Sequence, residues 1–237
     1  MDKVKEYFIS NIDDYSAYSK MGPVTSDGMM TINEHKIILT YLQHILDNNI
    51  EGDIVEFGCY GGGTSVAIKK LLKANNSNKK LYVYDSFEGL PENHENDKIA
   101  TNTKGTMVSS LQTYKDKIEK NNCKDINITK GFFKDIKESE LPEKISFAFY
   151  DGDLYQSTLD FLNKVEGKMS KGSIIIFDDF VHPQGIFPGT KVACNEYFKS
   201  NNAVTFLGDT HLLGSKDNFY YVDSSSVSQG IYEITKQ

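Results

Sequence analysis

Short apolar runs alternate with amphipathic segments along this chain. Each run is bounded by turn residues, which is typical of strands buried in a sheet. Such runs lie at Asp53–Phe57, Lys80–Tyr84, Ile126–Thr129, Ile145–Tyr150 and Ser173–Phe177. Helical spacing of apolar residues fills the intervals, at Thr64–Ala74, Thr106–Asn121 and Gln156–Lys168. The alternation predicts an α/β fold with a doubly wound, mostly parallel sheet.

The segment before the first strand departs from this alternation. Residues 1–30 are polar and are predicted to be irregular. Thr31 and Glu34 then have the spacing of a capping box, which predicts a helix with an apolar face reaching Leu46. We therefore expect residues 1–50 to form an N-terminal lid and accessory helix, and residues 51–237 to form one globular domain.

Two further segments are less regular. Asp85–Lys104 is polar and rich in turn residues, so we expect a mobile loop beside the site. After Gly189 the pattern predicts a helix to about Ser200 and then strands at Ala203–Leu207 and Phe219–Val222.

Composition and charge exclude several classes of function. The net charge of the 237 residues is −7, and all 26 basic residues are lysines, so a protein that binds nucleic acid is not expected. Without arginine there is no bidentate clamp for a phosphate group. The three cysteines, Cys59, Cys123 and Cys194, form no CxxC pair and are expected to be small buried residues. No apolar run approaches 18 residues and no signal peptide is recognisable, which predicts a cytoplasmic protein without a membrane partner.

Two acidic motifs about 27 residues apart are the main chemical signal. Asp151-Gly152-Asp153 follows one predicted strand, and Asp178-Asp179 follows the next. A strand–helix–strand unit makes these strands parallel neighbours, so both motifs leave the same edge of the sheet. Asp151, Asp178 and Asp179 are expected to share a small volume, where a hard divalent cation would offset their repulsion.

A glycine-rich turn follows the first predicted strand. Glu56 ends that strand and Gly58 begins the turn, which continues through Tyr60 to Thr64. Tyr at position 60 breaks the dinucleotide pattern GxGxxG, and no Gly-Lys-Ser/Thr completes a P-loop. Asp85, at the end of the second strand, is placed to accept hydrogen bonds from a ribose diol. S-adenosylmethionine (SAM) suits such a turn, because its cationic groups would lie near Glu56 and need no phosphate cradle.

With these motifs the chain resembles the macrocin O-methyltransferase family of SAM- and Mg²⁺-dependent enzymes that methylate sugar hydroxyls on natural products. The resemblance covers roughly residues 25–198. It rests on the segments Gly52–Gly58, Asp85–Pro91, Asp151–Thr158 and Asp178-Asp179, in this order. The family usually has Trp-Arg-Gly-Gly in the glycine turn, where this chain has Tyr60-Gly61-Gly62-Gly63.

The resemblance implies a role for each motif. It implies a class I SAM-dependent methyltransferase fold, which is Rossmann-like, and a homo-oligomer. Asp151, Asp178 and Asp179 match metal ligands, and Asp153 matches a proposed general base, with His182 as a second candidate. The positions expected to bind SAM are Glu56, Gly58, Tyr60, Thr64, Asp85, Ser86, Phe87 and Phe133, the last beside the adenine.

Two other functions stay open at this point. A glycosyltransferase would use Asp151-Gly152-Asp153 to hold a metal and a nucleotide-sugar diphosphate. It would have no arginine for the phosphates and no use for Asp178-Asp179. A non-catalytic SAM-binding module would need neither a base nor a metal. A sugar-containing small molecule or glycan is the acceptor that the family resemblance implies.

Overall fold

The computed structural model describes residues 2–15, 17–19, 22–24, 30–97, 104–181, 188–199, 203–209 and 228–236. Seven of the described strands form one sheet in the order β5-β4-β3-β6-β7-β9-β8. These strands are β3 (Asp53–Phe57), β4 (Leu81–Asp85), β5 (Ile126–Lys130), β6 (Ile145–Tyr150), β7 (Met169–Val181), β8 (Val204–Asp209) and β9 (Ser228–Ile234). The helices are α1 (Lys3–Ser10), α2 (Ile32–Asp47), α3 (Gly63–Ala74), α4 (Leu111–Lys120), α5 (Tyr155–Val165) and α6 (Pro188–Phe198).

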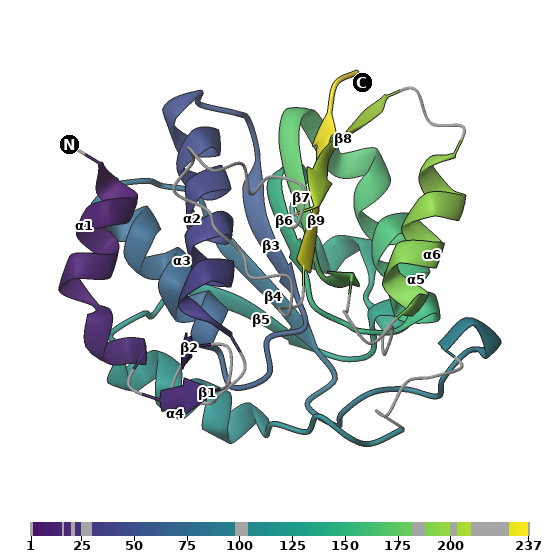
Figure 1. The fold of residues 1–237 in the computed structure, drawn as a ribbon, viewed down its shortest axis with the longest axis horizontal. Helices are drawn as coiled ribbons and strands as arrows, with labels where there is room; N and C mark the ends of the chain where they lie inside the picture. Colours follow the sequence, from purple (N-terminus) through teal and green to yellow (C-terminus); the bar gives the residue numbers. More distant parts are fainter. Residues whose placement is uncertain are drawn as a thin grey trace.

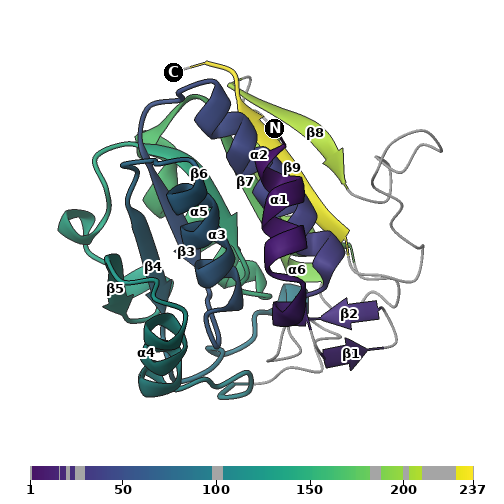
Figure 2. The same ribbon diagram turned by 90° about the vertical axis from the view of Figure 1, so that its left-hand side faces the viewer.

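Helices cover both faces of the sheet (Figure 1). One apolar core joins α1, α2, α3 and α4 to one face, with Leu39, Ile54, Ile68 and Phe147 among its fully buried residues. The core on the other face contains side chains of α5 and α6. The turned view in Figure 2 shows α1 outside α2 and α3. This is the predicted doubly wound architecture, with helical layers packed on a central sheet.

The predicted parallel arrangement is confirmed. β3 pairs in parallel with β4 and β6, and β7 pairs in parallel with β6. The predicted bounds of β3 and β6 match the structure to the residue. The turns after these strands therefore lie at one edge of the sheet, where the candidate site residues were predicted to be.

The prediction that residues 1–30 are irregular is wrong for much of the described part. α1 begins after Asp2, whose carboxylate accepts hydrogen bonds from the backbone N–H groups of Val4 and Lys5. A short antiparallel hairpin follows, with β1 at Ala17–Ser19 and β2 at Gly22–Val24. α1 escaped prediction because Tyr7 and Phe8 are its only buried residues, set among charged neighbours.

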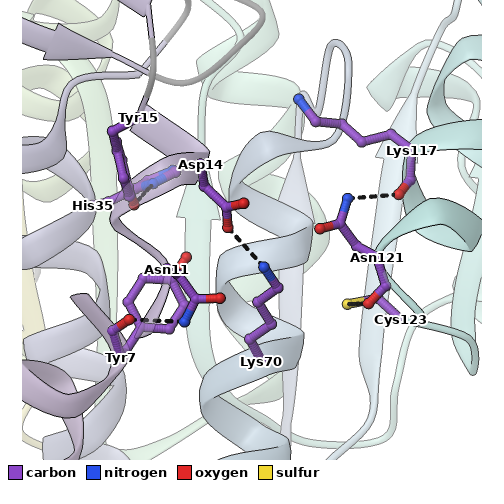
Figure 3. Close-up of polar contacts among 9 residues, drawn as sticks. All are labelled: Tyr7, Asn11, Asp14, Tyr15, His35, Lys70, Lys117, Asn121 and Cys123. Carbon is purple, nitrogen blue, oxygen red and sulfur yellow. Dashed lines mark hydrogen bonds and ion pairs between the residues drawn. The ribbon is translucent and has the colours of Figure 1, made fainter. Parts of the chain in front are cut away.

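The N-terminal segment is anchored to the rest of the domain by polar contacts (Figure 3). Lys70 on α3 forms an ion pair with Asp14 at 2.7 Å. The Tyr15 hydroxyl and His35 Nδ1 on α2 share a buried hydrogen bond of 2.6 Å. Residues before position 50 therefore share a core and polar contacts with the sheet domain, and their role as a lid stays a prediction.

The C-terminal part of the sheet is antiparallel and was only partly predicted. β8 agrees with the expected strand at Ala203–Leu207, whereas the expected strand at Phe219–Val222 lies outside the described residues. β9 was not predicted, and it pairs antiparallel with both β7 and β8. Among the described residues, no helix combines the length and apolar character that a membrane span requires.

Candidate active site

A cavity of about 310 Å³ lies at the carboxyl ends of β3, β4 and β6. Its walls come from the turns after β3, β5 and β6, from the loop after β4 and from α5. Five predicted cofactor residues line it: Gly58, Tyr60, Asp85, Ser86 and Phe133. The segment Asp151–Asp153 lines the same cavity. The volume falls in the range of small-molecule sites.

Asp85 ties the glycine-rich turn to the end of β4. Its Oδ2 accepts hydrogen bonds from the backbone N–H groups of Cys59 (2.9 Å) and Tyr60 (3.2 Å). Its Oδ1 accepts one from the N–H of Phe87 at 2.7 Å. A carboxylate offers about four acceptor positions, so one remains on Oδ1 for a ligand hydroxyl.

Gly58 allows the turn after β3 to pass very close to the acidic segment after β6. Its φ is +87°, a region that favours glycine, and a Cβ there would overlap the carbonyl oxygen of Asp151. The glycine is thus required for packing between the two turns, as well as for access to the cavity.

Glu56 lies buried beneath this turn. Its Oε2 accepts a hydrogen bond from the Ser65 hydroxyl, which in turn accepts one from the Tyr114 hydroxyl at 2.9 Å. Glu56 Oε1 has no hydrogen-bond partner among the described residues. Burial raises the pKa of Glu56 to about 8, with the Ser65 hydrogen bond opposing and the Asp85 charge reinforcing the change. An unsatisfied buried oxygen of this kind suits a cationic ligand group.

Thr64 and Phe87 lie behind the cavity wall rather than on it. The Thr64 hydroxyl shares a hydrogen bond of 3.0 Å with His35 Nε2. The Phe87 ring packs edge-on against Tyr114, with centroids 5.8 Å apart. Both residues therefore support the walls that would contact a cofactor. His35 itself is buried between α2 and α3, where it also bonds to Tyr15.

Three carboxylates gather beside the cavity. Oxygen atoms of Asp151, Asp153 and Asp179 all lie within 4.8 Å of one another. Asp153, in the turn after β6, and Asp179, on β7, have φ of +60° and +48°, a left-handed conformation that is uncommon for residues other than glycine. An all-oxygen set at this spacing is the donor chemistry that Mg²⁺ prefers.

Asp178 points toward the α2 side of the sheet. It continues the alternation of Ile174 and Ile176, whose side chains lie in the core with α2. Its Oδ1 accepts a hydrogen bond from Gln229 Nε2 on β9 at 3.0 Å. The expected trio Asp151, Asp178 and Asp179 thus shares two members with the compact trio of the structure, and Asp178 lies beside it.

These carboxylates strongly perturb one another. Burial raises the pKa of Asp151 well above its usual range, and Asp178 and Asp153 raise it further. The pKa of Asp178 is raised by burial and then by Glu34, while the Gln229 hydrogen bond opposes the rise. The pKa of Asp179 is raised by burial and by Asp153, Asp178 and Asp151. Such clustering is typical of a functional site.

Glu34 is the contributor that the sequence did not reveal. The capping box explains this residue fully, because Glu34 Oε2 accepts a hydrogen bond of 2.6 Å from the Thr31 N–H. Its burial against Asp178 arises only when α2 packs on the sheet. His182, the second candidate base, lies outside the described residues. The three cysteines are buried and free, as expected.

Comparison with known proteins decides the family. Residues 12–208 match the family described as Macrocin-O-methyltransferase (TylF). The chain belongs to the macrocin O-methyltransferase family. Macrocin O-methyltransferase relatives include demethyldecarbamoylnovobiocin O-methyltransferase of Streptomyces niveus, 27% identical over 184 residues, which are 74% of this chain and 69% of the relative.

Two further relatives match shorter parts of their own length. One is 8-demethyl-8-(2,3-dimethoxy-alpha-L-rhamnosyl)-tetracenomycin-C 4'-O-methyltransferase of Streptomyces olivaceus, 29% identical over 59% of this chain and 57% of the relative. The other is mycinamicin III 3''-O-methyltransferase of Micromonospora griseorubida, 26% identical over 67% of this chain and 66% of the relative. Both matches span less than two thirds of the relative.

Solved structures agree with the fold of the macrocin O-methyltransferase family. The O-methyltransferase NovP has a TM-score of 0.74 and 20% identity, with 99% of this chain and 98% of NovP covered. An O-methyltransferase from Bacillus cereus, solved in complex with SAH, has a TM-score of 0.59 and 15% identity, with 100% and 91% covered. The fold is therefore that of class I O-methyltransferases.

Proposed function

We propose that this chain is a SAM- and Mg²⁺-dependent O-methyltransferase that methylates a sugar hydroxyl of a glycan or natural product. One observation carries the proposal: the acidic segment Asp151–Asp153 lines the same cavity as Gly58 and Asp85 of the cofactor turns. A methyl donor and an acceptor hydroxyl would therefore meet beside the carboxylates. Proximity of this kind is a large part of the catalysis of group transfer.

The residues that would hold SAM fit its chemistry. Glu56 Oε1 is the buried acceptor near the glycine turn, where a cationic amino acid group would lie. Asp85 keeps an acceptor position for a ribose hydroxyl, and Phe133 offers an aromatic face for the adenine. When bound, SAM supplies an electrophilic methyl group and Mg²⁺ supplies positive charge that lowers the pKa of an acceptor hydroxyl.

The acidic cluster divides into metal ligands and a base. Asp151 and Asp179 belong to both the expected and the observed trio, and we propose that they and Asp178 hold the metal. Asp153 would accept the proton of the acceptor hydroxyl as the hydroxyl oxygen gains the methyl group. His182 is the second candidate for this step.

A neutral acceptor suits this site. Asp151, Asp153, Asp178, Asp179 and Glu34 concentrate negative charge at one edge of the sheet. An anionic acceptor would be repelled, whereas a sugar diol offers only neutral oxygens. The name of one relative specifies a rhamnosyl group, and the name of another specifies the 3'' position of mycinamicin III. We expect a homo-oligomer, as the family resemblance implies, and a cytoplasmic location.

Calorimetric titration of S-adenosylhomocysteine (SAH) and of Mg²⁺ tests the proposal. The wild type should bind both, and Asp151→Asn should retain SAH binding while losing most of the Mg²⁺ affinity. Asp116→Asn is the matched control, since Asp116 lies exposed on α4, where its side chain accepts a hydrogen bond from Gln112. A folded wild type that binds UDP with Mn²⁺ but not SAH would indicate a glycosyltransferase and refute the proposal.

The same titration separates the roles of Asp153 and Asp178. Loss of Mg²⁺ affinity in Asp178→Asn, with Asp153→Asn unaffected, would support Asp153 as the base. The reverse result would make Asp153 the third metal ligand. SAH binding without any Mg²⁺ binding would leave a metal-independent methyltransferase.

A further inference from the structure

A buried carboxylate from the loop after β4 meets the start of α5. Asp97 is 4% exposed and ends a 3-10 helix at Glu95–Asp97. Its Oδ1 accepts a hydrogen bond of 2.9 Å from the Tyr155 N–H, and its Oδ2 accepts one of 2.8 Å from the His94 N–H. The His94 ring stacks on Tyr155, with centroids 4.6 Å apart and planes at 23°.

α5 depends on this contact because it has no cap of its own. Its N-cap residue is Leu154, whose side chain cannot accept a hydrogen bond. Asp97, 58 residues earlier in the chain, accepts a hydrogen bond from the first N–H of α5, one of the helix-start donors that have no intrahelical partner. This is the helix-capping chemistry of an aspartate, delivered by a different segment.

The start of α6 also packs closely against the contact between Asp97 and α5. A Cβ at Gly189, at the start of α6, would overlap Asp97 Oδ1. The Thr190 hydroxyl donates a hydrogen bond of 3.3 Å to the carbonyl oxygen of Asp153. Three segments therefore converge directly beside the residue that we propose as the base.

The loop that carries Asp97 also forms a wall of the cofactor cavity. Gly89–Glu92 line that cavity, and Asp97 follows five residues later. Asp153 immediately precedes Leu154 and holds a φ of +60° that the surrounding contacts must maintain. Asp97 therefore contacts both the loop that forms the cavity wall and the helix that begins just after Asp153.

We propose that Asp97 is a positioning residue, which caps α5 from the cofactor loop and thereby links the cofactor wall to the placement of Asp153. The part concerning Asp153 as base rests on the proposed function. The link itself rests only on the contacts of Asp97. Binding of a cofactor against Gly89–Glu92 would stabilise the first turn of α5, so the two halves of the site would order together.

Hydrogen exchange of the full chain without ligand tests the link. In Asp97→Ala, the amides of residues 155–158 and of the loop before Asp97 should exchange about fivefold to tenfold faster. Asp2→Ala is the matched control, since Asp2 accepts hydrogen bonds from two backbone N–H groups at the start of another helix, α1. It should accelerate exchange only in α1. Faster exchange in the loop alone, or equally throughout the core, would overturn the proposal.

The same measurement with saturating SAH separates positioning from mere stability. In the wild type, SAH should slow exchange at Gly89–Glu92 and also at residues 155–158. In Asp97→Ala, SAH should still protect Gly89–Glu92, while protection at 155–158 is lost. Asp97→Asn keeps one acceptor oxygen and should show a smaller effect. This variant takes the place of Asp97→Ala in the test if the alanine variant does not fold. Equal SAH protection in all variants would refute the link.

Failure of the proposed function gives a different result. In that case SAH protects no residue of the wild type, while the ligand-free comparison of Asp97→Ala with Asp2→Ala still decides whether Asp97 caps α5.

Discussion

Gln229 Nε2 on β9 donates a hydrogen bond of 3.0 Å to Asp178 Oδ1 on β7. The two side chains are buried on the α2 side of the sheet, where the charge of Glu34 also raises the pKa of Asp178. The amide orients the carboxylate and opposes its protonation. Gln229 can therefore affect metal binding through the orientation and the pKa of Asp178.

We expect Gln229→Leu to lower Mg²⁺ affinity by about 10- to 100-fold, because Asp178 loses its orienting donor. SAH affinity should change little. Calorimetric titration measures both. Gln43→Leu is the control, since it removes the hydrogen bonds of Gln43 to Asp47 on α2 and to Asn75 at the end of α3. Unchanged Mg²⁺ affinity in Gln229→Leu would show that Asp178 needs no such support.

The buried Glu56 predicts a pH dependence of stability. Its pKa of about 8 lies above the reference value of 4.5, so the folded state binds the proton more tightly than the unfolded state. Its contribution is fully present below pH 4.5 and is lost as the pH rises through about 8. Denaturation of the wild type and Glu56→Gln across this range should show a difference that changes by a few kcal/mol. Parallel profiles would contradict the shifted pKa.

The hydrogen bond between Tyr15 and His35 predicts that the N-terminal segment contributes to the stability of the whole domain. Tyr15→Phe should reduce the free energy of unfolding by about 1–3 kcal/mol, because a buried polar partner is removed. Tyr197→Phe is the control, since that hydroxyl bonds to Glu166 at the surface and its loss should cost less than about 0.5 kcal/mol. Equal effects of the two substitutions would argue against the anchoring role.

Removing one charge from the acidic cluster should stabilise the metal-free protein. Asp179→Asn relieves repulsion with Asp151 and Asp153, and we expect a gain of about 1 kcal/mol. Mg²⁺ should raise the melting temperature of the wild type but not of this variant. A less stable metal-free variant would indicate that Asp179 has a structural partner.

The sequence predicts the central sheet well because its signals are local. β3 and β6 are apolar runs between turn residues, so their bounds follow directly from the pattern. β9 contains Gln229 and Gly230, and its extended conformation depends on pairing with β7 and β8. Such a strand has no strong local pattern to recognise.

Prediction of the site was limited in a similar way. Asp85 and Ser86 line the cavity because they follow a predicted strand directly. The carboxylates of Asp153, Asp151 and Asp179 lie close together where Asp153 and Asp179 have positive φ angles. An aspartate in a sequence does not predict such an angle. The contribution of Glu34 depends on how α2 packs, which a pattern along one helix cannot reveal.

The strand order β7-β9-β8 also constrains how the chain assembles. Among the described strands, β8 pairs only with β9, although β9 comes later in the sequence. β8 is therefore joined to the sheet only through β9, whose pairing with β7 links distant parts of the chain and is expected to form slowly. Gln229 lies on β9, so Asp178 gains this hydrogen-bond donor only when β9 pairs with β7. During synthesis, the chemistry of this edge would mature later than the cofactor cavity.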